Sequence, residues 1–381
     1  MSVSNFADTI KNLKNCIDDM LLERNKLSKI KGDKFISPIW SEVVSVFSYL
    51  MKLEAEDLKN IRFHTGLING DSWKYWHPYP KIDPEAEAKN IGYIEAIKDI
   101  PEEYWIGEPS SPNIPRSLGV DYKGHVINDN IVRFQKCISD LYRIKAFQSI
   151  ANSKKKQLVI EIGGGYGGLI HHISSIVGDK ATCVLVDLPE MLLFQGAYLA
   201  VNNPDKTLYV YDHKFTPEFV NKEMFNYDFI LIPNFALDKL CAVKEVSLMI
   251  NMQSFQEMTE NQVRAYLDFA GDRVTHCLYS DNMDKHPYNE TGLRSVTNIL
   301  QEYFDLYPSP RFYETFYKGC DPLRYDCYKR YFAFSKKKKR PLAETQLPEL
   351  SSRRKMSLKS RLIKKIIPKS ILKALIAWAS K

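Results

Sequence analysis

Hydrophobic and polar positions change their spacing along the chain near residue 150. Before that point, apolar residues recur every three or four positions, which is the spacing of one face of a helix. The first such run contains Phe6, Ile10, Leu13, Ile17, Met20 and Leu21. A second run starts at Ser37-Pro38, with proline in the first turn of the predicted helix, and a third covers about 128–150. Residues 1–150 are therefore expected to form a helical N-terminal domain that acts as a lid or binds the acceptor.

Residues 151–335 alternate short apolar runs with helical stretches. The runs that predict buried strands are 158–160, 182–186, 208–211, 229–232, 248–250 and 277–279. This alternation predicts an α/β fold with a mostly parallel sheet covered on both faces. Two aromatic runs at 312–317 and 325–334 predict an antiparallel hairpin at the edge of the sheet.

The last 25 residues, 357–381, have an amphipathic pattern that follows a basic linker over 336–356. One apolar face contains Leu358, Leu362, Ile363, Ile366 and Ile367, while lysines and arginines occupy the other face and no acid is present. A basic amphipathic helix of this kind suits an anionic membrane surface. Docking of the helix on a partner protein or on the body of the chain is one alternative, and RNA binding, for which aromatic interleaving is sparse, is another.

The net charge of the chain hides a division between its body and its tail. The total is +7, but 15 cations against two glutamates give residues 336–381 a charge of +13, which leaves −6 for residues 1–335. The body therefore offers no basic face for nucleic acid. The seven cysteines include no CxxC pair, which argues against a disulfide framework or a zinc finger. The start of the sequence lacks a signal-like apolar segment, so we expect a cytoplasmic protein, held at the inner face of the membrane by its tail.

The segment that carries the most chemical information is a glycine cluster directly after a predicted strand. Residues 158–162 lead into Gly-Gly-Gly-Tyr-Gly-Gly at 163–168, and a helix follows. Glycines permit positive φ and let a ligand lie against bare backbone, while the next helix offers free N–H groups. Gly163, Gly165 and Gly168 also match the dinucleotide pattern G-x-G-x-x-G. An NAD(P)-dependent oxidoreductase is therefore one interpretation of this loop.

Two carboxylates favour S-adenosylmethionine over a dinucleotide. Glu161 precedes the first glycine by two residues, where it would crowd a pyrophosphate but would suit a cationic amino-acid end and a sulfonium. Asp187 ends the next predicted strand, where a carboxylate can accept both ribose hydroxyls, although an NAD enzyme would also place an acid here, so Asp187 alone does not discriminate. A structural ion pair for Glu161 and a helix cap for Asp187 are the alternatives.

The motifs around these carboxylates resemble those of a known family. E-I-G-G-G-Y-G-G at 161–168, followed by V-D-L-P-E-M at 186–191, is similar to class I S-adenosylmethionine-dependent methyltransferases, and Asp-Leu-Pro to their O-methyltransferases. Residues 232–235 and 250–258, with 106–109 and 141–144 upstream, resemble a bacterial family of sugar O-methyltransferases. The resemblance covers about 101–334.

This resemblance implies a Rossmann-like class I methyltransferase sheet and a methyl transfer from S-adenosylmethionine to a sugar hydroxyl. It also implies a role in the biosynthesis of a surface polysaccharide. The residues expected to contact the cofactor are Glu161, Gly163, Gly165, Tyr166, Asp187, Leu188, Asn234, Phe235 and Asn251. A non-catalytic partner subunit with the same fold is a further alternative.

Methyl transfer to a hydroxyl needs in-line alignment and a base that takes the hydroxyl proton. Candidates should follow the carboxyl ends of strands, where ligands bind in such sheets. His286 is the first choice, because an imidazole titrates near neutral pH, and Glu257 is the second. His213 is a further candidate, and Asp212, Asp281 and His286 offer a possible metal site, although no metal is expected.

Aromatic residues in two N-terminal loops are candidates for an acceptor lid. Trp73, Trp76 and His77 lie in one loop and Trp105 in the other. Their rings would stack on a sugar, as the predicted glycan acceptor requires. The alternative is that they simply pack helices on the sheet.

Overall fold

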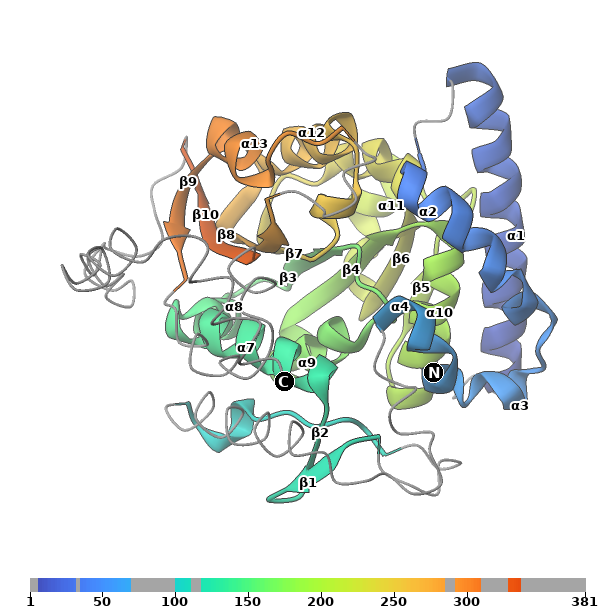
Figure 1. Cartoon of the computed structure of the whole chain (residues 1–381), viewed down its shortest axis with the longest axis horizontal. Coiled ribbons are helices and arrows are strands. Elements are labelled where there is room, and N and C mark those ends of the chain that lie inside the picture. Colours follow the sequence, from blue (N-terminus) through green and yellow to red (C-terminus); the bar gives the residue numbers. More distant parts are fainter. Residues whose placement is uncertain are drawn as a thin grey trace, which may run out of the picture.

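The computed structural model describes residues 6–31, 35–69, 100–110, 118–284, 292–309 and 328–336. Within these ranges the chain forms one eight-stranded sheet with helices on both faces, and a separate two-stranded ribbon (Figure 1). The predicted α/β fold is confirmed. His286, Trp73, Trp76, His77, the edge run 312–317, residues 337–356 of the linker and the helix at 357–381 lie outside the described residues.

The strands follow one another across the large sheet in the order β5-β6-β4-β3-β7-β8-β10-β9. Their bounds are β3 (Gln157–Ile162), β4 (Ala181–Asp187), β5 (Leu208–Val210), β6 (Phe229–Pro233), β7 (Val246–Met252), β8 (Val274–Met283), β9 (Phe304–Pro308) and β10 (Tyr328–Ser335). Strands β5 to β8 in this order are parallel, whereas β10 pairs antiparallel with both β8 and β9. The antiparallel edge hairpin is thus present, and the strand that pairs with β10 is 304–308.

The helices alternate with these strands. Those that precede the sheet are α1 (Phe6–Lys31), α2 (Pro38–Val43), η1 (Val44–Lys52), α3 (Ala55–Leu58), η2 (Ile61–Thr65), α4 (Gly66–Asn69), η3 (Glu102–Tyr104), α7 (Asp129–Arg143) and α8 (Ala146–Ala151). Those between the strands are α9 (Gly168–Val177), η4 (Gly178–Lys180), α10 (Pro189–Asn202), α11 (Pro217–Lys222), η5 (Met224–Asn226), η6 (Asn234–Ala242), η7 (Phe255–Glu257), α12 (Glu260–Ala270) and α13 (Val296–Tyr303).

The two-stranded ribbon lies inside the segment that was expected to be helical. It consists of β1 (Val120–Tyr122) and β2 (His125–Ile127), joined by a turn in which Lys123 and Gly124 have positive φ. Lys-Gly is a tight-turn sequence, but three-residue strands are too short to show an alternating pattern. The position of the domain boundary at residue 150 stays a prediction.

The direction in which the chain crosses the sheet reverses beside β3. Its successor β4 lies on one side of it, and β7 lies on the other. In an open parallel sheet, ligands bind in the crevice outside the carboxyl ends of the strands at such a reversal. The fold therefore places a crevice where Glu161, the glycine loop and Asp187 meet.

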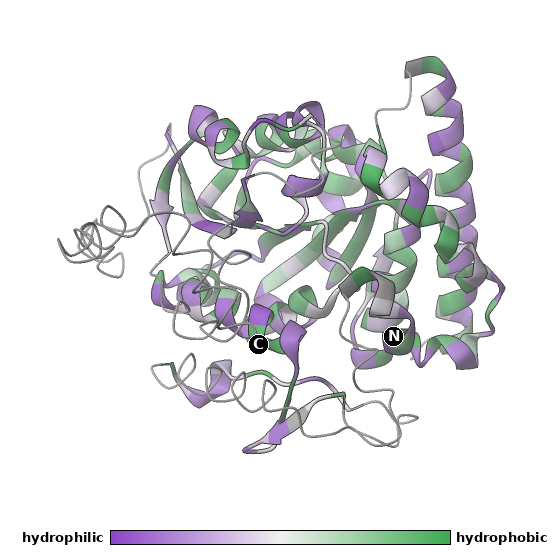
Figure 2. Cartoon of the chain, in the orientation of Figure 1, coloured by the Kyte–Doolittle hydropathy of each residue, from purple (hydrophilic) through white to green (hydrophobic). Residues whose placement is uncertain are grey.

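The N-terminal helix α1 packs along α10 on one face of the sheet (Figure 1). Its apolar residues join the core of the sheet, and Leu13 lies so close to Gly196 that an added Cβ there would be 2.7 Å from its methyl groups. Arg24 of α1 forms a bidentate ion pair with Glu190 at the start of α10, at 2.6 and 2.8 Å. Hydrophobic residues fill the central strands, whereas hydrophobic and hydrophilic residues alternate along α1 (Figure 2). These contacts hold the N-terminal segment firmly beside the crevice.

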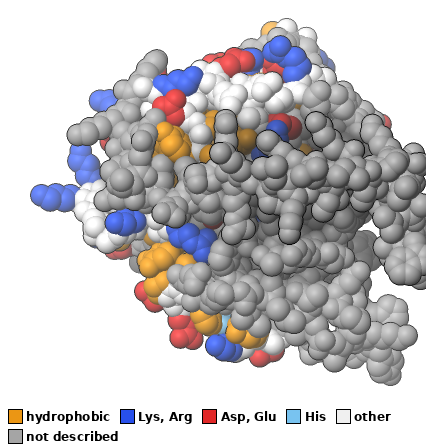
Figure 3. All heavy atoms as spheres, turned by 60° about the vertical axis from the view of Figure 1, so that its left-hand side comes forward, with side chains coloured by type: hydrophobic (Ala, Val, Ile, Leu, Met, Phe, Trp, Pro, Cys, Tyr) orange, Lys and Arg blue, Asp and Glu red, His pale blue; other side chains and the backbone are white. Residues whose placement is uncertain are grey.

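The described surface mixes charges of both signs. Figure 3 shows acidic and basic side chains interspersed among the described residues of one face. Among those residues that face carries no continuous basic stripe; the absence of a nucleic-acid partner stays a prediction. In the part of the chain that is described, no helix is long and apolar enough to cross a membrane.

Candidate cofactor site

The glycine loop connects β3 to α9 and needs its glycines for geometric reasons. Gly163 has a φ of +68°, in the left-handed region that L side chains rarely adopt. A Cβ at this position would also lie 2.2 Å from Oγ of Ser254, in the turn after β7. The loop therefore has close backbone packing that only glycine allows.

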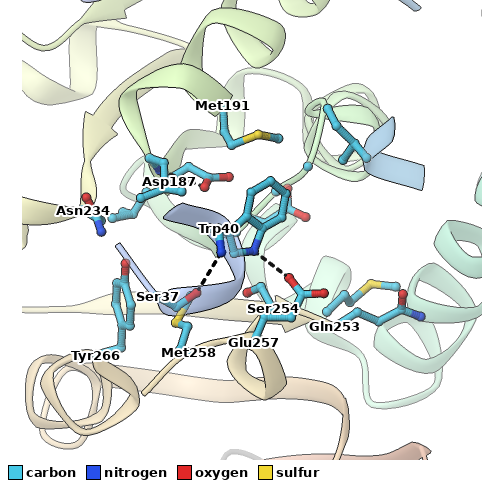
Figure 4. A pocket seen from close by; sticks show the side chains of 18 of the residues that line it. Ser37, Trp40, Asp187, Met191, Asn234, Gln253, Ser254, Glu257, Met258 and Tyr266 are labelled. Atoms are coloured by element: carbon cyan, nitrogen blue, oxygen red, sulfur yellow. Dashed lines mark hydrogen bonds between the residues drawn. The ribbon is translucent and has the colours of Figure 1, made fainter. Parts of the chain in front are cut away.

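A pocket opens at the carboxyl ends of β3, β4, β6 and β7, with α2 on its outer side (Figure 4). The strand pairing brings its walls together, because Asp187 of β4 lies opposite Pro233 of β6, and Ile162 of β3 opposite Asn251 of β7. Most of the predicted site residues line it, namely Glu161, Gly163, Gly165, Tyr166, Asp187, Leu188, Asn234 and Glu257. Phe235 and Asn251 do not.

Glu161 is a buried carboxyl group with no counter-ion among the described residues. Its side chain is 3% exposed, and its Oε2 has no hydrogen-bond partner among the described residues. Burial raises its pKa to about 8, and the nearby Asp187 adds to the increase. The ion pair considered as an alternative is absent within the described ranges. A desolvated carboxyl group at the wall of a cavity is typical of a functional site.

Asp187 is oriented by two donors at the end of β4. It accepts hydrogen bonds from the Leu188 backbone N–H at 2.8 Å and from Gln195 Nε2 at 2.6 Å. Burial raises its pKa to about 7, and the charge of Glu257 contributes. The alternative role as a helix cap is wrong, since the N-cap residue of α10 is Leu188 and α10 has no side-chain cap. Gln195 also donates to the Gly165 carbonyl at 3.1 Å, so one amide couples Asp187 to the glycine loop.

Asn234 offers a single acceptor to the pocket. Its Nδ2 donates to the Phe35 carbonyl at 2.5 Å, which identifies Oδ1 as the remaining atom. That oxygen is buried and has no partner among the described residues. The next residue, Phe235, instead contacts the rings of Phe35 and Tyr211 edge-on, with centroids 6.0 and 6.2 Å apart. It belongs to the packing behind the pocket.

Asn251 supports the glycine loop through hydrogen bonds to Ile162 and Ser254. It is fully buried, donates to the Ile162 carbonyl at 3.0 Å and to Ser254 Oγ, and accepts from Asn282 Nδ2 at 2.9 Å. Its side chain is thus fully engaged at the ends of β3, β7 and β8. The geometry favours a positioning role, which holds Ser254 against Gly163, over direct contact with a ligand.

Tyr166 is held from behind by a buried cation. The guanidinium of Arg62 lies 4.4 Å from the centroid of its ring, and Arg62 pairs with Glu108 at 2.9 Å. The ring of Tyr198 lies 4.8 Å away on another side. The loop residue that lines the pocket is therefore fixed by packing.

Glu257 lies in η7, and Trp40 of α2 contacts it across the pocket. Trp40 Nε1 donates to Glu257 Oε2 at 2.9 Å (Figure 4). Burial raises the pKa of Glu257 to about 7, an increase that the Trp40 hydrogen bond partly offsets. A carboxyl group with a pKa near the working pH is suited to take a proton.

The other described candidates for the base or a metal do not line the pocket. Asp212 and His213 follow the edge strand β5, where His213 is exposed and Asp212 accepts from Tyr209 Oη at 2.6 Å. Asp281 is buried in β8 and pairs with Arg330 at 3.2 Å and with Lys136 at 3.6 Å. No three His, Cys, Asp or Glu side chains in the described ranges are placed to hold a metal.

Trp105, the described tryptophan of the predicted acceptor lid, does not line the pocket. Trp105 Nε1 donates to the Ile100 carbonyl at 3.1 Å, and its ring meets His125 edge-on. The alternative of simple packing fits this residue. The other members of the predicted lid lie outside the described residues.

Several residues of the pocket are not apparent in the sequence. Trp40 is one, because no local pattern links residue 40 to residue 257. Arg133 of α7 is another; it lines the pocket and donates to Gln253 Oε1 at 2.8 Å. Gln253 has a φ of +63°, a strained value for a residue other than glycine. Such values are frequent at functional sites but cannot be seen in a sequence.

Comparisons with known proteins give a fold-level likeness only. No protein-family model matches the sequence, and no curated protein matches it. An O-methyltransferase family protein from Burkholderia thailandensis has 9% identity and a TM-score of 0.31, over 55% of this chain and 60% of that one. The mitomycin 7-O-methyltransferase MmcR has 11% identity and a TM-score of 0.28, over 54% of this chain and 57% of that one. Fibrillarin from Aeropyrum pernix, in complex with natively bound S-adenosyl-L-methionine, has 11% identity and a TM-score of 0.29, over 50% of this chain and 76% of that one. The chain thus spans less than two thirds of the first of these proteins, and the interpretation of the pocket has to rest on its own residues.

Proposed function

We propose that this protein is an S-adenosylmethionine-dependent methyltransferase. The observation that carries the proposal is the polarity of the unsatisfied groups in the pocket. Glu161 Oε2 and Asn234 Oδ1 are both buried acceptors without partners among the described residues. Buried polar groups need hydrogen bonds, so the ligand must bring donors and positive charge. S-adenosylmethionine brings an ammonium, a sulfonium, two ribose hydroxyls and an adenine amino group.

The order of the acceptors along the sheet edge fits this ligand. Asn234 follows β6, Asp187 ends β4 and Glu161 lies in β3, and these three strands are neighbours in that order. Strands lie about 4.8 Å apart, so the acceptors extend over roughly 10 Å. We assign Asn234 Oδ1 to the adenine amino group, Asp187 to the ribose hydroxyls and Glu161 to the cationic amino-acid end.

A nicotinamide dinucleotide suits the same pocket less well. Its pyrophosphate would lie against the glycine loop, next to the carboxyl group of Glu161. Negative charge there would raise the pKa of Glu161 further, and Arg133, a cation of the pocket wall, already donates to Gln253 and Asn130. The oxidoreductase is therefore the second candidate, supported only by the glycine pattern.

The acceptor that we propose is a sugar hydroxyl, in the biosynthesis of a surface polysaccharide. Its support is the resemblance of residues 232–235 and 250–258 to sugar O-methyltransferases. When bound, S-adenosylmethionine supplies an electrophilic methyl group. Glu257 would accept the proton that the hydroxyl loses, and the glycine loop and Asp187 would hold the donor in line. His286 remains a second candidate for this proton.

A transfer assay tests this function. The protein is incubated with methyl-labelled S-adenosylmethionine and glycan extracts of the host, with and without a chelator. Label that appears in a glycan only with active protein supports the proposal. Loss of transfer on chelation would indicate that a metal-bound water, and not Glu257, accepts the proton of the hydroxyl. Cofactor binding without transfer to any acceptor would favour a non-catalytic partner subunit.

A further inference from the structure

A short N-terminal segment crosses the mouth of the pocket. Residues 35–40, which we call the strap, are tied down at both ends. At one end the Phe35 carbonyl accepts from Asn234 Nδ2 at 2.5 Å, and at the other Trp40 Nε1 donates to Glu257 Oε2 at 2.9 Å. Figure 4 shows Trp40 reaching into the pocket from α2.

The two anchors lie on opposite sides of the crevice. Asn234 follows β6 and Glu257 follows β7, and the sheet order β6-β4-β3-β7 places two strands between them. The strap therefore bridges the carboxyl ends of β4 and β3, where Asp187 and Glu161 lie. A ligand held by both of these carboxyl groups would have the strap on its outer side.

Local sequence sets the shape of the strap. Ser37 is the N-cap residue of α2, with its Oγ accepting from the Trp40 backbone N–H, and Pro38 occupies the first helical position. Both residues fix the turn at which the chain enters α2. The partly buried indole of Trp40 is thereby held at the pocket wall.

We propose that the strap closes over the bound cofactor and that Trp40 is a specificity-determining residue of this site. This inference rests on the proposed function. The Phe35 end of the strap lies beside Asn234, where the adenine would bind, whereas the indole of Trp40 lies at the Glu257 end, where it would cover the sulfonium side of the cofactor. The indole N–H stabilises the ionised form of Glu257. Closure of the cofactor pocket and preparation of the base are therefore coupled through one side chain.

The test compares Trp40→Phe and Trp40→Ala with wild type in the full-length protein. The matched control is Trp105→Phe, which also loses one indole hydrogen bond, in this case to the Ile100 carbonyl, at a residue that does not line the pocket. A cation held against an aromatic ring contributes roughly 2- to 30-fold in affinity. Trp40→Ala should weaken S-adenosylmethionine binding within that range, mainly through faster dissociation in stopped flow. Trp105→Phe should bind like wild type.

A second measurement distinguishes a coupling of Trp40 to the protonation of Glu257 from simple packing of Trp40 against the cofactor. Trp40→Phe keeps an aromatic cover but removes the donor to Glu257, so the midpoint of its pH–rate profile should move to higher pH. Wild-type affinity and dissociation rate in folded Trp40→Ala would overturn the inference and leave the proposed function standing. Tighter binding of S-adenosylmethionine to Trp40→Ala would show that the Trp40 side chain obstructs the pocket, and this result would also overturn the inference. Absence of binding by wild type would overturn both proposals.

Discussion

Replacement of Glu161 with glutamine should stabilise the free protein and weaken cofactor binding. The ordinary pKa of a glutamate is 4.5, and in the folded protein burial raises that of Glu161 to about 8. At pH 7 the unfolded carboxyl group is ionised while the folded one keeps its proton. Each pKa unit corresponds to 1.36 kcal/mol, so at pH 7 the group lowers the free energy of unfolding by about 3 kcal/mol. The Glu161→Gln side chain has the same shape but a neutral amide, so it does not carry this free-energy cost.

The pH dependence has a defined sign. Because the pKa is raised on folding, the contribution of Glu161 is most favourable below pH 4.5 and is lost as the pH rises to about 8. Urea unfolding of the free protein at pH 5, 6, 7 and 8 should show a stability difference between Glu161→Gln and wild type that grows with pH. In calorimetry the same variant should lose about 1.5–3 kcal/mol of affinity for S-adenosylmethionine, as for a hydrogen bond to a charged group.

Glu108→Gln is the matched control, because Glu108 is equally buried but paired. It contacts Arg62 at 2.9 and 3.2 Å, and its removal leaves a buried guanidinium without its counter-charge. That change should destabilise the protein by about 3–5 kcal/mol. If Glu161→Gln also destabilises the free protein at pH 7, Glu161 has a stabilising partner and the reasoning is refuted.

Five further predictions concern the pocket and the C-terminal tail. Asp187→Ala should weaken S-adenosylmethionine binding by about 1.5–3 kcal/mol in calorimetry, and unchanged affinity in a folded variant would contradict the ribose assignment. Glu257→Gln should lower turnover about a hundredfold with cofactor affinity kept. Wild-type turnover should rise with pH through about 7, because the base must lose its proton, whereas a flat profile from pH 6 to 8 would exclude this carboxyl group. Gly163→Ala should cost about 1–3 kcal/mol in thermal melting, and Ser254→Gly should recover part of it; no recovery would place the whole cost in the backbone. A chain truncated after Ser335 should keep its fold and its turnover on a small soluble acceptor, but should no longer sediment with anionic liposomes, since each lost Lys or Arg contributes about 1 kcal/mol; equal sedimentation of both chains would contradict the membrane placement.

The sheet and the glycine loop could be predicted because their signals are local. A buried parallel strand carries a continuous apolar run, as at 158–160 in β3, and the glycines at 163–168 begin at the end of that strand. Glu161 and Asp187 hold fixed positions relative to the ends of their strands. Parallel pairing then brings both to one edge, so their meeting in a pocket followed from the predicted topology.

The strap and the role of Asn251 could not be predicted, because they depend on contacts between distant segments. Trp40 and Glu257 are 217 positions apart, and Asn251 bonds to the Ile162 carbonyl 89 positions away. In the sequence, Asn251 has the same appearance as a ligand-binding residue after a strand. Only the pairing of β7 with β3 shows that its amide is engaged beneath the loop.

The edge of the sheet was predicted in kind but not in position. The first strand of the edge hairpin was predicted at the aromatic run 312–317. In the structure β10 pairs with Phe304–Pro308, which contains an acid and follows α13 without a loop. A strand that begins directly at a helix end shows no turn signal. Half-exposed edge strands therefore carry a weaker pattern than the buried centre.

The central claim is that the pocket recognises a cationic nucleoside, and calorimetric titration of the full-length protein tests it most directly. S-adenosylmethionine and NAD⁺ are titrated separately at pH 7.5 into wild type and Glu161→Gln. We expect saturable one-to-one binding of S-adenosylmethionine to wild type, weaker binding to the variant, and no binding of NAD⁺ to wild type. Binding of NAD⁺ together with no binding of S-adenosylmethionine would contradict the account.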